Sequence, residues 1–526
     1  VIGSGSGGLT AALALAKAGR RVVVFEQHQL PGGYSQSFSL EGFRFSPGIH
    51  YVGQLGPGAR LRQIYEGLGV ADDLVFLELN PNGYDRVLVG DARFDIPKGQ
   101  GRFAERLKRR FPSEAKGIDA YMRVVTSMNN ELQWATPPQT ASEAVMLPVR
   151  MRTVLRYGLL PLDRFLDRFT RDRLLRAILS IQAGDHGMAP SRAPAALHAG
   201  LQNYYFEGGW YPRGGGRAIP EAFVKQIVGR GGEVILGTGV ERILVERKRA
   251  IGVRLEDGTE VRADIVVSNA DPSETWAHLV DREHVTTRLS QRVRHLKYSV
   301  STFSLFLAVD MDLRAAGFDS GNVWYSRSSD IEASYNLAQL DDLSRVSEIP
   351  GLFFSVTTLK DPSMRTDGLH TVEVMVLASH AAFAKWRGSR VGQRPDDYMR
   401  LKQHLAEKML DAVEQFVPGL RGHIVFRSTA TPLTNMHYVR ATEGAIYGTE
   451  KSLRNLGPFS FPVRTHIGGL YQCGASTIAA GINGVTNSGL AAAVAALGCK
   501  EEELLTTTNQ TLRVYPAEGP PEESSA

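Results

Sequence analysis

Three glycines at the start of the chain constrain its fold more than any other feature. Residues 1–8 read Val-Ile-Gly-Ser-Gly-Ser-Gly-Gly, so an apolar segment runs directly into Gly3-x-Gly5-x-x-Gly8. The first glycine permits a tight turn after a strand, the second lets the backbone approach a pyrophosphate, and the third lets the next helix pack against the strand. Phosphates would then lie at a helix N-terminus, where free N–H groups and the helix dipole favour negative charge.

The residues after the glycines complete a dinucleotide-binding pattern. Residues 9–18 are rich in helix formers, and Gly19 can end that helix in a left-handed conformation. Residues 21–25 form a β-branched run typical of a buried parallel strand. Glu26 follows at the carboxyl end, where an acid is placed to bind ribose hydroxyls. Strand, glycine turn, helix, strand and acid predict a Rossmann-type unit. A glycine turn without a ligand is the alternative interpretation.

Two further glycine motifs favour FAD over NAD. Pro31-Gly32-Gly33 is similar to the flavoprotein pattern in which the chain runs along an extended FAD, although a plain turn is the simpler interpretation. Gly474-Ala475-Ser476-Thr477 and Gly481-Ile482-Asn483 precede a small-residue helix at 486–497, whose start would stabilise negative charge on a reduced flavin. No second complete glycine fingerprint follows, so the electron donor stays open: a transient donor, a soluble carrier or the substrate itself.

The length of the chain predicts several folding units. The chain has 526 residues, and domains usually contain roughly 100–200. After a helical insertion, α/β patterning resumes near residue 210, and apolar strands recur between 290 and 440. We predict an α/β fold, with a Rossmann-type FAD-binding domain of the glutathione-reductase-like kind and a substrate domain of mixed sheet plus helical insertion. The predicted segments are 1–95, 210–289 and 441–505 for the FAD-binding domain, 96–209 for the helical insertion and substrate or membrane region, 290–440 for the substrate-binding domain, and 506–526 for a disordered tail.

The formal net charge of the whole chain, +5, equals the formal net charge of one arginine-rich segment. Residues 145–181 contain eight arginines and three aspartates, with Arg164, Arg168 and Arg171 opposite an apolar face of Leu162, Phe165, Leu166 and Phe169. A basic amphipathic helix can lie on an anionic membrane. The alternative is a surface helix docked on the protein core. Nucleic-acid binding is less favoured, because the segment has no interleaved aromatic platform and no recognised module.

The cysteines, the histidines and the apolar runs bear on the cellular compartment, on metal sites and on membrane spans. Cys473 and Cys499 form no disulfide framework and have no metal-ligand spacing, so a reducing, cytoplasmic compartment is expected. His186 and His198 lack partners at useful spacing, and no metal site is predicted. No apolar run reaches the roughly 18 residues of a membrane span. Because the chain begins within an apolar run, a leader upstream of Val1 stays open.

The motifs resemble those of the FAD-dependent carotenoid and retinoid oxidoreductases, a group that includes phytoene desaturase, carotenoid isomerase and retinol saturase. The shared residues are Gly3, Gly5, Gly8, Glu26, Gly32-Gly33, Tyr211-Pro212-Arg213-Gly214-Gly215, Val266-Val267-Ser268-Asn269 and Gly474-Ala475-Ser476-Thr477. Residues 42–53, 107–114 and 444–448 look closest to the retinol saturases. Ser46-Pro47-Gly48 stands where those enzymes read Asp-Thr-Gly, and the C-terminal motif is more similar to the desaturases.

The resemblance implies a two-domain flavoprotein with a deep apolar tunnel, a conjugated polyene as substrate, and peripheral membrane attachment. It strengthens the interpretation of the arginine-rich segment as the surface that contacts the membrane. His50 and Tyr51 are the predicted proton donor or flavin-ring contacts, with a packed loop histidine as the alternative. His186 and His198 are candidate tunnel residues. The predicted FAD-binding residues are Gly3, Gly5, Ser6, Gly7, Gly8, Glu26, Gln27, Gly32, Gly33, Tyr34, Ser35, Gly48, His50, Arg213, Val240, Asn269, Gly474, Ala475, Ser476, Gly481, Ile482 and Asn483.

Three functions are compatible with these residues. The first is an FAD-dependent saturase that delivers hydride from flavin N5 to a double bond of a retinoid or carotenoid. The second is a desaturase or a redox-neutral cis-trans isomerase on the same scaffold. The third is a flavin- or lipid-binding protein without catalysis. Product mass distinguishes a saturase from an isomerase, since only the saturase adds two hydrogens.

Overall fold

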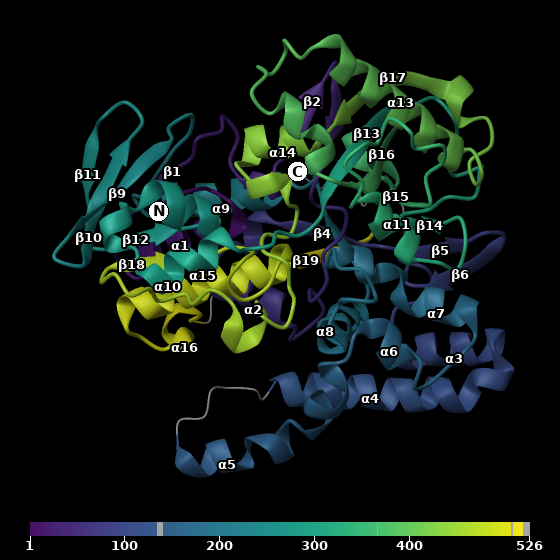
Figure 1. The fold of residues 1–526 in the computed structure, drawn as a ribbon, viewed down its shortest axis with the longest axis horizontal. Helices are drawn as coiled ribbons and strands as arrows, with labels where there is room; N and C mark the ends of the chain where they lie inside the picture. Colours follow the sequence, from purple (N-terminus) through teal and green to yellow (C-terminus); the bar gives the residue numbers. More distant parts are fainter. Residues whose placement is uncertain (134–139, 366, 507–508, 519–526) are drawn as a thin grey trace.

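The computed structural model describes residues 1–133, 140–365, 367–506 and 509–518 of the chain, shown in Figure 1. Its helices are α1 (Ser6–Lys17), α2 (Arg60–Leu68), α3 (Gln100–Arg110), α4 (Ala115–Gln133), α5 (Ala141–Arg150), α6 (Leu162–Leu166), α7 (Arg173–Ser180), α8 (Ala195–Tyr205), α9 (Ala218–Val228), α10 (Thr287–Arg294), α11 (Glu332–Leu337), α12 (Thr357–Lys360), α13 (Asp396–Val413), α14 (Pro432–Val439), α15 (Gly481–Leu497) and α16 (Glu501–Leu504). None of these helices has both the length and the apolar character needed to span a bilayer.

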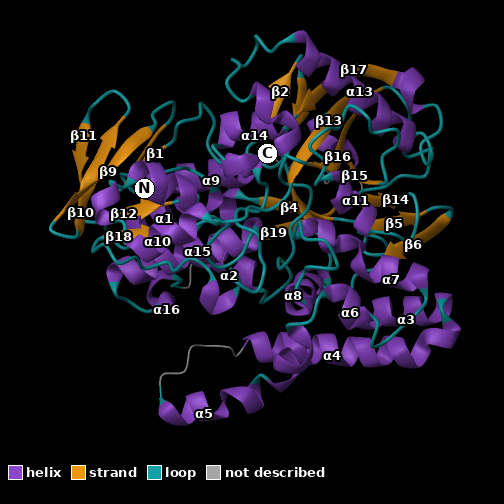
Figure 2. Cartoon of the chain, in the orientation of Figure 1, coloured by secondary structure: helices purple, strands orange, loops and turns teal. Residues whose placement is uncertain are grey.

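The strands form two main sheets and several smaller ones. They are β1 (Val23–Phe25), β2 (Phe38–Leu40), β3 (Phe43–Phe45), β4 (Val75–Glu78), β5 (Asp85–Val89), β6 (Ala92–Ile96), β7 (Trp210–Pro212), β8 (Glu233–Ile235), β9 (Val240–Glu246), β10 (Arg249–Leu255), β11 (Glu260–Arg262), β12 (Val266–Ser268), β13 (Ser301–Val309), β14 (Asn322–Ser326), β15 (Gly351–Val356), β16 (His370–Ala378), β17 (Ile424–Ala430), β18 (Leu470–Gln472) and β19 (Arg513–Pro516). Figure 2 shows the strands gathered in two regions, with a mainly helical region below the right-hand one.

A short parallel sheet organises the region around the N-terminus. β1 pairs with β8, β12 pairs with β18, and Ile2 bridges both β1 and β12, so the chain start lies in the middle of the sheet. Val24 and Val267 are fully buried, as expected for parallel strands covered on both faces. α1 packs against α15 and α9. This arrangement confirms the predicted α/β fold class with its Rossmann-type unit.

The second region is built on a seven-stranded mixed sheet. Its order is β17-β13-β16-β15-β14-β5-β6, and all neighbours are antiparallel except β14 and β5. All nine residues of β13 are buried, which explains its unbroken apolar sequence. Residues 85–96 supply β5 and β6, so the first hundred residues contribute strands to both regions. β15 ends at Val356, where the chain turns into α12 and directs Lys360 into the interior.

The helical insertion lies beside the seven-stranded sheet and has its own core. α4 packs against α3 and α8, and the blue helices of Figure 1 show this layer with α5 at its edge. In α6, Leu162, Phe165 and Leu166 are buried in the core of the insertion. The apolar face predicted for this segment is therefore already covered by protein.

The end of the chain includes an ordered strand in place of the expected disorder. Residues 513–516 form β19, which pairs in parallel with β4. Leu512 is buried and Val514 packs against the N-terminal core, so apolar side chains anchor this segment although its surroundings are rich in proline and glutamate. Residues 507–508 and 519–526 of the predicted tail lie outside the described residues.

Candidate functional site

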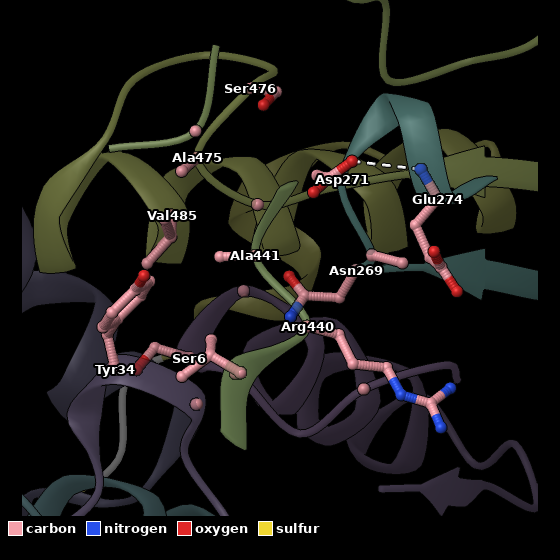
Figure 3. Close-up of a pocket in the computed structure, with 18 of the residues that line it drawn as sticks. Ser6, Tyr34, Asn269, Asp271, Glu274, Arg440, Ala441, Ala475, Ser476 and Val485 are labelled. Atoms are coloured by element: carbon pink, nitrogen blue, oxygen red, sulfur yellow. Dashed lines mark hydrogen bonds between the residues drawn. The ribbon is translucent and has the colours of Figure 1, made fainter. Parts of the chain in front are cut away.

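A cavity lies at the carboxyl ends of the parallel strands. Gly3, Glu26, Asn269 and Cys473 all line it, and each follows a strand or bridge of that sheet. Ligands of open α/β sheets bind in this position, outside the carboxyl ends of the strands. In Figure 3, Ser6 and Tyr34 lie on the left of the cavity, and Asp271, Glu274 and Arg440 lie on the right.

The glycines of the first motif are required by close packing. A Cβ on Gly8 would lie 2.2 Å from the carbonyl oxygen of Gly3, which is where the helix crosses the strand. A Cβ on Gly5 would lie 2.6 Å from Nδ2 of Asn269, and one on Gly7 would lie 2.7 Å from Oδ1 of the same side chain. Asn269 therefore packs against the glycine turn from the end of β12 and leaves no room for larger residues.

Two helix N-termini meet this cavity without a protein cap. α1 begins at Ser6 and α15 begins at Gly481, and both residues line the cavity. Neither helix has an acidic residue in its first turn or a side chain that caps it. The first N–H groups of a helix need acceptors and carry partial positive charge. The two uncapped ends therefore fit the phosphates and the electron-rich edge of a flavin dinucleotide.

Glu26 is held in place by three hydrogen bonds. Its Oε2 accepts from the backbone N–H and the hydroxyl of Ser4, each at 2.8 Å, and its Oε1 accepts from the backbone N–H of His28 at 2.9 Å. The residue is buried at the cavity wall. Each carboxylate oxygen has more than one lone pair, so acceptor capacity remains for ribose hydroxyls.

Most of the predicted cofactor residues come together around this cavity. Its lining includes Gly3, Gly5, Ser6, Gly7, Glu26, Gln27, Gly32, Gly33, Tyr34, Ser35, Gly48, Val240, Asn269, Gly474, Ala475, Ser476, Gly481 and Ile482. Gly8 lies just behind the wall, where it allows the helix to approach the strand. Asn483 is hydrogen-bonded to Asn487 within α15 and does not line the cavity. Arg213 is exposed, and its backbone N–H donates to Val75.

Sequence reasoning missed several wall residues, among them Asp271 after β12 and Arg440 after α14. Asp271 accepts hydrogen bonds from Tyr298 Oη at 2.8 Å and from the backbone N–H groups of Glu274 and Thr442. Arg440 lines the same wall. These side chains lie in loops without any motif, and only the tertiary fold brings them together.

Two further cavities adjoin the first. One is mainly apolar and is walled by residues of β2, β13, α13 and α14; we call it the long cavity. The other lies between β14, β15, β16 and α11 and includes Asp185 in its wall; we call it the Asp185 cavity. Ile446 and Tyr447 line all three cavities, and His50 lines the long cavity and the Asp185 cavity. The first cavity, which we call the dinucleotide cavity, thus shares part of its wall with the long cavity: Tyr34, Gly48, Tyr438, Val439, Ile446 and Tyr447.

A buried ionic network lies behind His50. Nδ1 of His50 is 3.3 Å from Oε2 of Glu373, and Lys360 Nζ donates to the His50 carbonyl at 2.6 Å and to Ser355 Oγ at 2.7 Å. Burial raises the pKa of Glu373 to about 7 and lowers the pKa of Lys360 to about 7. Burial, reinforced by Lys360, lowers the pKa of His50 to about 3, so the ring is neutral. The one sequence signal of this network was Glu373, a charged residue inside the mainly apolar β16.

Tyr51 lies behind the cavity walls, and the histidine pair does not reach them. The Tyr51 hydroxyl lies 2.5 Å from Asp185 Oδ2 and 3.1 Å from Asp85 Oδ2. His186 and His198 are buried with their ring nitrogens 3.3 Å apart, and the wall of none of the three cavities includes them. Among the described residues, no group of three or more potential metal ligands occurs.

Comparison with known proteins decides the family. The model for flavin-containing amine oxidoreductases matches residues 6–497. The chain belongs to this family. A zebrafish (Danio rerio) all-trans-retinol 13,14-reductase is 30% identical over 517 residues, covering 93% of this chain and 84% of the relative. A carrot (Daucus carota) chloroplastic prolycopene isomerase is 25% identical over 491 residues, covering 90% and 76%. An oxidoreductase structure from Methanosarcina mazei shares the fold, with a TM-score of 0.63 at 18% identity, covering 93% of this chain and 98% of that one.

The family assignment and the site geometry agree on the cofactor. The protein is an FAD-dependent oxidoreductase, as the sequence motifs predict. The residues fit FAD because the glycine turn, the two uncapped helix ends and Glu26 meet in one elongated cavity. The apolar long cavity shares Ile446 and Tyr447 with this site.

Proposed function

We propose that the protein saturates a carbon-carbon double bond of an apolar polyene. The observation that carries this proposal is the long cavity, which is mainly apolar and shares six wall residues, among them Ile446 and Tyr447, with the dinucleotide cavity. A hydrocarbon chain offers few polar groups, so shape and apolar burial must position it. Phe38, Phe306 and Met375 line the long cavity and supply such a surface. The similarity to a retinol reductase supports the same class of substrate.

FAD, when bound, supplies the acceptance and release of hydride. Gly5, Ser6 and Gly7 would hold the pyrophosphate at the start of α1, and Glu26 would hold the ribose. The chain must also deliver a proton to the second carbon. His50 lines the long cavity, and its contact with Glu373 places a second proton-binding group directly behind the ring.

A redox-neutral isomerase is the second candidate. It needs the same cofactor cavity and the same apolar cavity, and the similarity to a prolycopene isomerase favours it. A desaturase and a flavin- or lipid-binding protein without catalysis are the remaining alternatives. These functions differ in the hydrogen content of the product, so product mass distinguishes them.

The experiment is anaerobic incubation of the FAD-loaded, dithionite-reduced protein with all-trans-retinol and, separately, with a carotenoid. A gain of two hydrogens with a blue-shifted absorbance spectrum is expected. An unchanged mass with a new isomer would replace the saturase by the isomerase. With no product from either ligand, oxidised protein is tested on phytoene, a more saturated substrate; a product there would indicate a desaturase, and none would leave the non-catalytic alternative.

We also propose that the protein collects its substrate at a membrane surface through the mouth of the long cavity. Leu40, Val391 and Met399 line this cavity and are exposed by 39%, 39% and 52%. Arg394 and Lys402 stand beside them and suit anionic lipid headgroups. The arginine-rich segment is the other candidate, with Val145 and Val149 of α5 exposed by 75% and 61%. In Figure 1, α5 lies at the bottom and α13 and β2 lie near the top, so the two surfaces can be tested separately.

A further inference from the structure

The Asp185 cavity combines an apolar wall with one carboxyl group. Ile181, Ile331 and Phe353 are among the side chains that line it. Asp185 is the single lining residue with a carboxyl group. An isolated carboxyl is costly in apolar surroundings unless it finds a partner. Its presence therefore requires an explanation beyond packing.

The hydrogen bonds around Tyr51 indicate that the carboxyl group of Asp185 is protonated. The Tyr51 hydroxyl lies 2.5 Å from Asp185 Oδ2 and 3.1 Å from Asp85 Oδ2. A hydroxyl donates one proton, so one of the two carboxyl groups must donate its own proton to complete both contacts. Asp85 also accepts from Gln182 Nε2 at 2.7 Å and from Asn322 Nδ2 at 2.9 Å, which favours its ionised form. Asp185 is then the protonated, neutral acid.

The cavity also contains polar groups that lack a partner. Within the described part of the chain, Asp185 has no hydrogen-bond partner besides Tyr51. Tyr335 and Tyr447 line the same cavity, and the hydroxyl of neither is hydrogen-bonded to a described residue. Burial first, and Asp85 second, raise the pKa of Asp185 well above its usual range, in agreement with the proton count. A neutral acid beside two phenols favours a neutral donor-acceptor group over an ammonium ion.

We propose that the Asp185 cavity binds a terminal hydroxyl group of the substrate and so selects a polyene alcohol over a hydrocarbon polyene. This inference rests on the proposed function for the polyene itself. The chain of the substrate would lie in the long cavity beside the flavin, and its polar end would pass His50 into the Asp185 cavity, since His50, Thr302 and Met375 line both. A site built to bind a hydroxyl rejects an analogue that lacks it, because its own polar groups are then left unpaired.

The test measures binding to the oxidised, FAD-loaded protein by quenching of tryptophan fluorescence. The ligands are all-trans-retinol, its methyl ether, its deoxy hydrocarbon and retinylamine. Wild type is expected to bind the alcohol about 10- to 100-fold more tightly than the hydrocarbon, the factor for one buried polar group left unpaired. Asp185→Leu is expected to abolish this preference by weakening only the alcohol. Asp185→Asn retains an acceptor and should keep most of the preference, and Ile181→Val is the control on the same wall.

Several outcomes would overturn the inference. Equal affinity of wild type for the alcohol and the hydrocarbon would do so, as would a preference for retinylamine, which would indicate an amine site. An unchanged preference in Asp185→Leu would also contradict it, and if that variant fails to fold, the wild-type ligand series still decides. The product-mass assay separates the two proposals. If wild type adds two hydrogens to retinol but shows no hydroxyl preference, the inference fails and the function stands. If the preference is present but no product forms, the function fails and the hydroxyl site stands.

Discussion

The dinucleotide cavity and the long cavity lie next to each other, but their walls are made of different parts of the chain. The first is formed largely by backbone: glycine turns and two helix ends that follow short parallel strands. The second is formed by side chains from β2, β13, α13 and α14, which are far apart in the sequence. A cavity made of backbone tolerates almost no substitution at its turns, whereas a cavity made of apolar side chains can change its shape by small steps. The predictions below test this difference.

The largest effect is expected at Gly8. Gly8→Val would place Cβ 2.2 Å from the Gly3 carbonyl oxygen, and neither backbone segment can move without breaking the parallel sheet. We expect loss of bound FAD together with loss of cooperative folding, measured by flavin absorbance and circular dichroism. Gly200→Ala in α8 is the matched control, because nothing lies within 4 Å of the added Cβ. A Gly8→Val protein that retains FAD would contradict the close-packing argument.

The next effect concerns the ionic network between the two regions. Lys360 is fully buried and contacts the loop of His50 on one side and Ser355 of the seven-stranded sheet on the other. Lys360→Met leaves the His50 carbonyl, the Asn322 amide oxygen and the Ser355 hydroxyl without their buried donor. Each buried polar group left unsatisfied costs about 1–3 kcal/mol, so we expect a loss of about 3 kcal/mol or more in the free energy of unfolding, measured by urea denaturation. Lys402→Met, at the mouth of the long cavity, should change it by less than about 1 kcal/mol.

The pH dependence of stability tests the same network. The pKa of Glu373 rises from 4.5 to about 7 on folding, mainly through burial. The folded state therefore binds this proton more tightly than the unfolded state, and the group's stabilising effect is full below pH 4.5 and lost as the pH rises to about 7. Glu373→Gln has no carboxyl group to titrate and so does not show this loss of stability. The free energy of unfolding of the variant, relative to that of wild type, should therefore increase by up to about 3 kcal/mol as the pH rises from 4.5 to about 7. A constant difference between pH 4.5 and 7 would show that Glu373 does not titrate there.

The sequence predicts the backbone-built cavity well and the side-chain-built cavities poorly. Gly3, Glu26 and Gly474 stand in local patterns whose spacing has one structural solution, and all three line the dinucleotide cavity. Asp185 and Lys360 have no such pattern, because their environment depends on segments more than a hundred residues away. The amphipathic pattern of α6 was visible, but periodicity shows only that a face is buried. It does not distinguish burial by protein from burial by lipid.

A smaller effect is expected when Glu26 is replaced, and FAD binding and folding stability can be measured separately in that variant. Glu26→Ala leaves the two donors of Ser4 and the backbone N–H of His28 without a buried acceptor. Each unsatisfied donor costs about 1–3 kcal/mol before relaxation, so both FAD retention and stability should fall. Flavin content after gel filtration and thermal unfolding with excess FAD measure the two effects. Glu233→Ala, at the exposed start of β8, is the control. Unchanged flavin content would remove Glu26 from the ribose site.

The smallest effect is expected at the membrane. Leu40→Asp combined with Met399→Asp adds charge to the exposed apolar mouth of the long cavity, where the two side chains are 39% and 52% exposed. We expect about a tenfold weaker association with anionic liposomes, because each buried apolar side chain contributes about 1.5–3 kcal/mol when fully buried and these are only partly so. Reversing Arg164, Arg168 and Arg171 tests the other surface, where the apolar side chains of α6 pack inside the protein. Should the arginine variant lose liposome binding while the mouth variant pellets as wild type does, the membrane faces the helical insertion, and the substrate must reach the long cavity by another path.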